Sequence, residues 1–250
     1  MMIAPNEYGT QDIQNELLDI MKTFHSFCEE HGIEYTLYGG SCLGAVRHRG
    51  FIPWDDDLDI CVDRDNYNKL RRLFRKCRGL KMRKTIWIYR IQKRDGKPIR
   101  GYVPTLDVFV IDHAPSRPVL FKLKNLCLAT LQGMLKEEVS YEGFSPVYKM
   151  FLFVTHMMGK PFSVKLLRYW YDRASAIGNG SPAEMVHCTN TSFKWIQNRY
   201  PADTWAGRTL VPFEDAQFYI PSGYDRYLII CYGDYMKLPE NEERRPEHAG

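Results

Sequence analysis

The chain has 250 residues, of which 44% are hydrophobic, 14% aromatic and 26% charged. This composition is typical of an ordinary globular protein and excludes a disordered, fibrous or collagen-like chain. Lys and Arg number 34 against 30 Asp and Glu, so the formal charge of +4 gives no sign of a nucleic-acid partner. We therefore expect no nucleic acid to bind, and an anionic partner would have to be recognised by local clusters of charge.

The seven cysteines are scattered singly, without a CxxC pair or the Cys and His spacing of a zinc site. Isolated cysteines in odd number, several inside apolar runs, are typical of free thiols in a reducing compartment. The first twelve residues lack the basic and apolar regions of a signal peptide, and no segment approaches the roughly 20 apolar residues of a membrane span. These features predict a cytoplasmic protein.

The chain begins with a helix, a short strand and a second helix. Residues Gln11 to Glu30 carry apolar side chains at three- and four-residue spacings and stop at Gly32, which predicts an amphipathic helix. Tyr35 to Tyr38 is a short β-type run. Gly39 to Ser41 reads as a glycine turn, and Leu43 to Arg47 as one or two helical turns.

A second strand begins within a run of aspartates. From Asp57 to Val62 acidic and apolar residues alternate, which places carboxylates on one face of a strand and apolar side chains on the other. A helix capped by Asp63 or Asp65 should follow and run to about residue 77.

Later segments complete a mixed pattern. Two further strands are expected at 86–91 and 105–111, after which the pattern becomes helical and apolar through about residue 177. The fold class predicted is α/β of the α+β kind, a mixed sheet with flanking helices followed by a mainly helical C-terminal half. We expect a core at 1–115 and a second region at 116–250.

Asp57 and Asp59 are two residues apart on a predicted strand. Their carboxylates therefore leave the same face, about 6.6 Å apart at the backbone for a rise of roughly 3.3 Å per residue. Carboxylates this close repel each other unless a cation lies between them, and oxygen ligands suit Mg²⁺ or Mn²⁺. The alternative is a solvated loop whose aspartates cap helices and form turns.

Gly39, Gly40 and Ser41 lie between a predicted strand and a predicted helix, where backbone N–H groups can hold phosphate oxygens. A glycine pair alone usually marks an ordinary turn, but one followed by a DxD at the start of a strand indicates a joint site for phosphate and metal. Asp107, in another buried strand, is expected to be a third metal ligand or a base for an attacking hydroxyl. Its alternative is a paired structural acid.

A glycosyltransferase is the competing class, because its DxD also holds a metal against a nucleotide diphosphate. In that class an apolar strand usually precedes the acids. Here the apolar alternation follows them and the glycine turn comes first, which is the order of a nucleotidyltransferase-type site.

Residues Tyr38 to Ile60, YGGSCLGAVRHRGFIPWDDDLDI, resemble the signature of the LicD family of phosphocholine transferases, relatives of fukutin and the fukutin-related protein. Residues 232–239, YGDYMKLP, followed by Glu243, Arg244 and His248, are similar to the C-terminal motif of that family. The region from Pro115 to about Ala202 matches no motif of the family, and we expect it to select the acceptor.

The resemblance implies a nucleotidyltransferase-like fold that transfers phosphocholine, or a similar phospho-substituent, from a CDP-linked donor such as CDP-choline. The acceptor would be a sugar hydroxyl of a cell-surface glycan, for example lipopolysaccharide or teichoic acid, or of its lipid-linked precursor, and CMP would leave. The core at 1–115 would be catalytic, and 116–250 would face the acceptor and close the site.

Carried over residue by residue, the resemblance assigns donor phosphate to Gly39, Gly40 and Ser41, and the metal to the three aspartates Asp57, Asp59 and Asp107. Two arginines one turn beyond the glycine loop, Arg47 and Arg49, would clamp phosphate oxygens unless they are plain surface charges. Asp55 and Asp56 are expected to cap or support the site, and His48 and His248 are weaker candidates for acid and base.

Two other functions stay open. In the first, a true nucleotidyltransferase with the same acids would move a nucleoside monophosphate and release pyrophosphate. In the second, the protein would bind a glycan or another anion without catalysis.

Two segments stand out by charge and apolar character. Residues 69–84 contain nine basic residues and no acid, which indicates either an anion-binding face or a solvated helix surface. Residues 119–171 interleave apolar side chains with Lys and Arg. This pattern fits helices in peripheral contact with the inner face of a membrane, or helices packed on the catalytic core.

Overall fold

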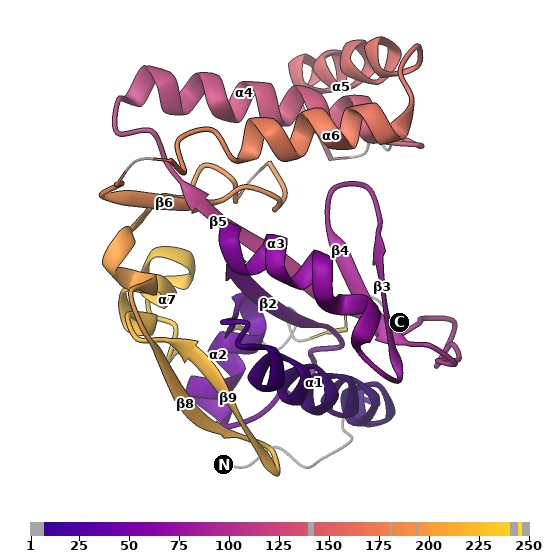
Figure 1. Ribbon diagram of the computed structural model, residues 1–250, viewed down its shortest axis with the longest axis vertical. Coiled ribbons are helices and arrows are strands. Elements are labelled where there is room, and N and C mark those ends of the chain that lie inside the picture. Colours follow the sequence, from indigo (N-terminus) through magenta and orange to yellow (C-terminus); the bar gives the residue numbers. More distant parts are fainter. Residues whose placement is uncertain (1–7, 140–142, 181, 194, 241–244, 247–250) are drawn as a thin grey trace. The chain divides into compact units, whose positions relative to one another are not determined.

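The computed structural model describes residues 8–139, 143–180, 182–193, 195–240 and 245–246 (Figure 1). They form two compact units. The first is built from the described parts of 1–83, 89–111 and 202–250, and the second from 84–88 and the described parts of 112–201. Glu243, Arg244 and His248, from the C-terminal motif, lie outside the described residues.

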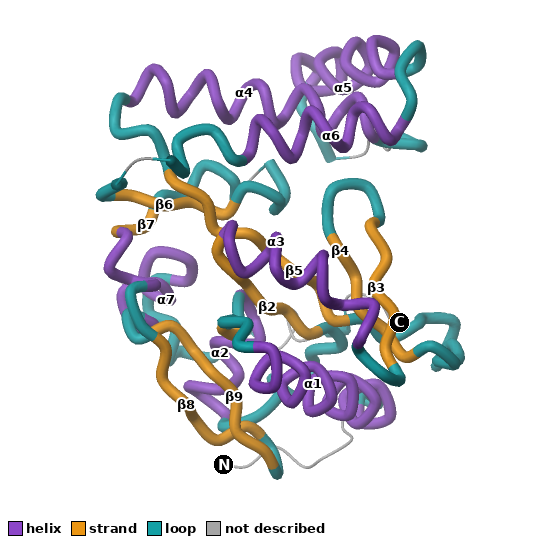
Figure 2. Tube along the Cα trace, in the orientation of Figure 1, coloured by secondary structure: helices purple, strands orange, loops and turns teal. Residues whose placement is uncertain are grey.

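Five strands form the sheet around which the first unit is built: β1 (Thr36–Leu37), β2 (Leu58–Asp63), β3 (Leu80–Lys84), β4 (Tyr89–Lys93) and β5 (Leu106–His113). Their order is β1-β2-β5-β4-β3, as the strands coloured orange in Figure 2 show. β2 and β5 are parallel, whereas β1 runs antiparallel to β2 and β4 antiparallel to β5. This mixed sheet with helices against it confirms the expected α+β class.

Three helices of the first unit come from the first part of the chain: α1 (Gln11–His31), α2 (Gly39–His48) and α3 (Arg64–Leu73). α1 confirms the predicted helix, since its apolar residues, Leu17 and Phe24 among them, are buried and Gly32 ends it with left-handed backbone at φ 58°. Asp63 caps α3 by accepting a hydrogen bond from the N–H of Asn66 at 2.7 Å. Figure 1 shows α1 and α3 in front of the strands.

Two local predictions differ from the structure. The expected glycine turn is the first turn of α2 itself, because Tyr38 is extended and Gly39, at φ 53°, turns the chain directly into the helix. β3 was not predicted: it lies within the basic run, where alternating Leu, Lys, Met and Arg form a strand rather than an extension of α3. The strand expected at 86–91 is β4, which begins at Tyr89.

The segment from 202 onward returns to the first unit, although the sequence grouped it with the helical second region. It contains a 3-10 turn (Ala202–Trp205), the hairpin β8 (Arg208–Phe213) and β9 (Ala216–Pro221), and α7 (Tyr224–Tyr232). β9 contacts β1. The phenol oxygen of Tyr227 on α7 accepts a hydrogen bond from the N–H of Gly39 at 2.8 Å. These contacts explain why the segment belongs beside the first motif.

The second unit consists mainly of three helices: α4 (Pro118–Leu135), α5 (Pro146–Gly159) and α6 (Val164–Ser175). Leu128 and Leu131 of α4 share an apolar core with Leu167 and Tyr171 of α6. The unit also contains the short strands β6 (Met185–Cys188) and β7 (Tyr200–Pro201), which pair antiparallel. In the part of the chain that the structure describes, none of the helices has both the length and the apolar character needed to cross a membrane.

Candidate active site

Two of the predicted aspartates are neighbours on the central strands. Asp59 of β2 and Asp107 of β5 are register partners in a parallel pair. Register partners point to the same face of a sheet, and adjacent strands lie about 4.8 Å apart. The residues that flank them in the chain, Leu58 and Ile60 on β2 and Leu106 and Val108 on β5, are fully buried on the opposite face. The apolar face therefore fixes the strands, and the two carboxylates project together from the other face.

Asp107 has a basic partner that the sequence did not reveal. Arg90 of β4 lies opposite Asp107 in register, and its Nε is 3.1 Å from Asp107 Oδ1. The hydroxyl of Thr105 also donates to Oδ1 at 3.2 Å. Asp107 is thus a paired acid, but its side chain remains 15% exposed. The pair fixes the orientation of the carboxylate, and its position beside Asp59 is compatible with a functional role as well.

The N-terminus of α2 lies against the acids. Ser41 Oγ accepts a hydrogen bond from the backbone N–H of Asp59 at 2.8 Å. A Cβ on Gly39 would lie 3.0 Å from Asp59 Oδ2, and one on Gly40 would lie 2.9 Å from Asp55 Oδ2. Glycine is therefore needed at both positions for the carboxylates to approach the backbone. Gly39 and Ser41, which were predicted to hold phosphate, therefore lie beside Asp59, the second aspartate of the DxD.

This helix start is suited to an anion. The first N–H groups of an α-helix have no partner within the helix, and the helix dipole places partial positive charge there. In α2 those first residues are Gly39, Gly40 and Ser41. The N–H of Gly39 donates to Tyr227, so the N–H groups of Gly40 and Ser41 are the candidates to hold an anion. Backbone N–H groups can hold phosphate oxygens on one side while the Asp59 carboxylate lies on the other.

Asp57 lies directly before β2 and is partly exposed, whereas Asp56 is completely buried. Burial raises the pKa of Tyr102 to about 12, and the charges of Asp107 and then Asp57 act in the same direction. Both carboxylates therefore raise the pKa of the same phenol, which stays protonated at neutral pH.

A second tyrosine lies near the other two acids. Tyr232 ends α7, and its phenol oxygen is 3.9 Å from the position that a Cβ on Gly39 would take. Although the whole residue is 40% exposed, burial of its hydroxyl end raises the pKa of Tyr232, with smaller contributions from Cys231, Asp59 and Asp55. A neutral phenol thus lies beside the start of α2.

The acids fit a metal only in part. Among the described residues, no three His, Cys, Asp or Glu side chains are placed to hold one ion together. The Asp59 and Asp107 pair supplies two carboxylates on one face. Mg²⁺ commonly takes one or two protein carboxylates and completes its shell with water and substrate phosphates. This pair therefore suits a divalent ion that is bound together with a phosphate-bearing substrate, and the three-aspartate set stays a prediction.

Arg47 and Arg49 lie at the far end of α2 from the glycines. Because the helix begins at Gly39, Arg47 lies more than two turns away, about 12 Å at 1.5 Å per residue, and not one turn beyond a glycine loop as expected. Arg47 Nη1 donates to the carbonyl oxygens of Tyr235 at 2.9 Å and Lys237 at 3.3 Å. Arg49 ends the helix at φ 59°. The structure does not bring either arginine to the glycines, and Arg47 instead joins the two sequence motifs.

His48 is paired with its neighbour Arg47. Arg47 Nε donates to His48 Nε2 at 3.0 Å, and burial, followed by the Arg47 charge, lowers the pKa of His48 to about 4. His48 is therefore neutral at pH 7.

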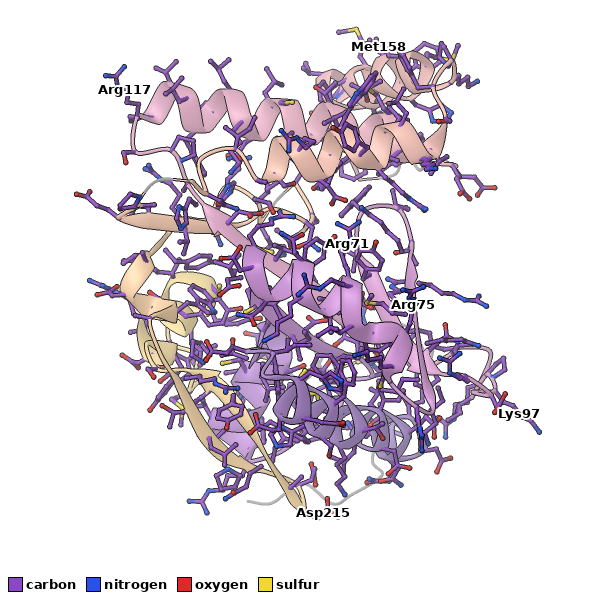
Figure 3. The ribbon with its side chains drawn as sticks, in the orientation of Figure 1. Arg71, Arg75, Lys97, Arg117, Met158 and Asp215 are labelled. Atoms are coloured by element: carbon purple, nitrogen blue, oxygen red, sulfur yellow. The ribbon has the colours of Figure 1, made fainter. Side chains whose placement is uncertain are left out.

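The basic run lines a cavity of about 590 Å³ in the first unit. Arg71 and Arg75, which are labelled in Figure 3, line it together with Lys81 and Arg94, and no acid is among the lining residues. Anion binding at this face stays a prediction.

Gln14 of α1 holds the loop that carries the aspartates. Its side-chain amide, which is buried, donates to the carbonyl oxygens of Ile52 at 3.1 Å and Asp55 at 2.8 Å. Thr10 Oγ1 donates to the carbonyl of Pro53 at 2.7 Å. Sequence analysis did not single out Gln14, because a glutamine within a helical pattern carries no signal of its tertiary partners.

Replacing Gln14 with Leu should loosen this loop. We expect the free energy of unfolding to fall by about 1–3 kcal/mol, because two carbonyl groups lose their donor and one of them is buried. Urea unfolding followed by circular dichroism measures the loss. Gln11→Leu is the matched control on the same helix, because Gln11 donates to its helical neighbour Asn15. Equal midpoints for the two variants would contradict the role of Gln14.

A glycine-started helix set against paired strand carboxylates is the arrangement expected of a phosphotransferase. The family model described as "LicD/FKTN/FKRP, nucleotidyltransferase domain" matches residues 32–114, the segment that contains α2, β2 and β5. This segment of the chain therefore matches the LicD family, which confirms the resemblance seen in the first motif.

Two curated relatives illustrate the range of similarity. The lipopolysaccharide cholinephosphotransferase LicD of Haemophilus influenzae is 27% identical over 254 aligned residues, which cover 92% of each chain. The human ribitol 5-phosphate transferase FKRP is 48% identical over 46 residues, which cover 17% of this chain and 9% of FKRP. Similarity therefore extends along nearly the whole chain in one case and is confined to a short segment in the other.

Proposed function

We propose that this enzyme transfers phosphocholine, or a similar phospho-substituent, from a CDP-linked donor to a sugar hydroxyl of a surface glycan such as lipopolysaccharide, or of its lipid-linked precursor. The observation that carries the proposal is the placement of Asp59 beside Asp107 on adjacent strands, with Asp59 against the glycine start of α2. The full-length similarity to the Haemophilus enzyme supports phosphocholine and lipopolysaccharide. The similarity to a ribitol 5-phosphate transferase supports transfer of a phospho-substituent more generally.

In the proposed reaction, the acceptor hydroxyl oxygen bonds to the phosphorus of the phosphocholine group. The bond from that phosphorus to the oxygen of CMP breaks, CMP leaves with the electron pair, and the hydroxyl proton passes to a base. Catalysis of phosphoryl transfer is mainly positioning and neutralisation of charge.

The residues divide these tasks. The N–H groups of Gly40 and Ser41 at the start of α2 hold phosphate oxygens of the donor, and the protonated phenol of Tyr232 lies beside them. Asp59 and Asp107 would hold Mg²⁺ or Mn²⁺, with Asp57 as the further predicted ligand. When bound, the ion would neutralise the charge that develops on the phosphates. Asp107 is alternatively the base, and its pairing with Arg90 fixes its direction.

For the setting, we propose the reducing cytoplasm, with peripheral contact to the inner face of a membrane. All seven cysteines are free thiols, and five of them are buried. Buried free thiols are common in proteins of reducing compartments.

The deciding measurement is CMP release from CDP-choline, with Mg²⁺ or with EDTA, in the presence and absence of lipopolysaccharide that lacks phosphocholine. We expect release that needs both the ion and the acceptor, with transferred phosphocholine visible by phosphorus NMR. Release from CDP-ethanolamine or CDP-ribitol alone would keep the mechanism and change the donor. Pyrophosphate release with a nucleotide-labelled acceptor would contradict the proposal and favour transfer of a nucleoside monophosphate.

A further inference from the structure

Two helices of the second unit expose large apolar side chains. Those on α4 and α5 are Val119, Leu120, Leu123, Leu126, Val147, Met150, Phe153, Val154, Met157 and Met158. Exposure is high, at 68% for Val119, 74% for Val147 and 64% for Met150. Globular proteins rarely leave so many large apolar groups on adjacent helices without a use. We call these ten residues the apolar stripes.

The stripes follow helical spacing. Val119, Leu123 and Leu126 recur four and three residues apart along α4, and Met150, Val154 and Met157 do so along α5. Residues at these spacings share one side of a helix. The core of the unit uses other residues of α4, including Leu128, Leu131 and Leu135. Each stripe is therefore an additional apolar side that the core leaves uncovered.

The two helices are in contact. A Cβ on Gly133 of α4 would collide with the Thr155 side chain of α5, so α5 packs closely against this glycine. Figure 3 shows Arg117, at the start of α4, at the upper left of the view and Met158, on α5, at its top right.

The charged side chains on the two helices are basic. Lys122 on α4 and Lys149 on α5 are exposed, whereas Lys124 is buried and donates to the carbonyls of His113 and Ile177. Neither helix contains Asp or Glu, and the exposed acids Glu137 and Glu138 follow the end of α4. Arg117 precedes α4 and Lys160 follows α5, and both are exposed. An apolar face with a basic rim complements a lipid surface with anionic headgroups. A second copy of the chain would instead bring the same basic rims against each other.

We propose that α4 and α5 form a docking surface for an anionic lipid bilayer, lying in the plane of its interface with the apolar stripes inserted. Lys122, Lys149, Lys160 and Arg117 would contact headgroup phosphates from the rim. The binding itself is independent of the proposed transfer reaction. Its benefit, which is to hold the enzyme beside a lipid-linked acceptor, rests on that proposed function.

Sedimentation with vesicles tests the docking surface. The full chain should bind vesicles of phosphatidylglycerol with phosphatidylcholine and bind phosphatidylcholine alone much more weakly, because the rim is basic. The double variant L123E/M150E should lose binding to the anionic vesicles by about tenfold or more, because each substitution buries a charge in the interface. L210E is the matched control, since Leu210 is 43% exposed on β8, which belongs to the first unit.

Other outcomes overturn the assignment. Equal binding of wild type and the double variant, or no binding to either vesicle, would refute the lipid surface. A second result would also refute it: wild type forms a concentration-dependent dimer in ultracentrifugation, the double variant does not, and vesicles bind neither protein. That result would assign the stripes to contact with a second copy of the chain. Matching circular dichroism spectra and melting temperatures establish that the variants are folded. CMP release with a water-soluble acceptor reports separately on the transfer reaction, so the two proposals can fail independently.

Discussion

Asp59→Asn should lower the rate of transfer by about 10²- to 10³-fold, the size of effect seen when one group that stabilises transition-state charge is removed. The substitution removes a negative charge and keeps the shape of the side chain. The structural hydrogen bond at this position runs from the backbone N–H of residue 59 to Ser41 Oγ, so the variant retains it. The loss should therefore appear in activity and not in folding.

Steady-state CMP release at several Mg²⁺ concentrations measures this prediction, together with a thermal melt. The variant should also need more Mg²⁺ for half-maximal rate, because one of the two proposed carboxylate ligands of the ion is gone. Asp95→Asn is the control, since Asp95 is exposed in the turn after β4. A fall of only a few-fold, or a fall that simply follows a lower melting temperature, would contradict the role of Asp59.

Gly44→Ala should destabilise the fold by about 3 kcal/mol, the upper part of the range for overpacking. A Cβ at this position would lie 2.5 Å from the carbonyl oxygen of Gly50 and 3.3 Å from the backbone N of Ile52. Both obstacles are backbone atoms, which cannot turn aside like the end of a long side chain. Ile52 is further held by the amide of Gln14, so α2 or the loop would have to shift as a whole.

Urea unfolding compares this variant with Gly180→Ala. Gly180 has no heavy atom within 4 Å of its ideal Cβ position and no positive φ, so the control should stay within about 0.5 kcal/mol of wild type. The transfer rate of Gly44→Ala should fall as well, because the displaced loop carries the aspartates. An unchanged unfolding midpoint would show that α2 and the loop can separate without cost.

Local features of this fold were predictable because their causes are local. The helix at α1 follows from apolar spacing and from the left-handed residue Gly32, and the start of α3 follows from an aspartate that can cap it. β2 and β5 follow from alternation and apolar content. Within the site, the glycines and Asp59 were placed together correctly, since a strand, a glycine-rich helix start and a second strand are close in the chain.

The remaining parts depend on tertiary register. That Arg90 faces Asp107 is a consequence of how β4 pairs with β5, and nothing in either strand alone specifies it. The positions of Arg47 and Arg49 were misjudged because the helix starts on the glycines rather than after them. The return of residues 202–240 to the first unit depends on contacts of Tyr227 and Tyr235 with α2, which are invisible without coordinates.

The hydrogen bond between the Gly39 N–H and Tyr227 spans 188 positions of sequence, and that between Arg47 and Tyr235 also spans 188. A growing chain is made from its N-terminus, and contacts this distant close late and slowly. The ribosome must therefore synthesise the chain past Tyr235 before the start and the end of α2 have their partners. A nascent chain of this enzyme would therefore carry its glycines and aspartates for most of the time of synthesis without the contacts that Tyr227 and Tyr235 make to α2.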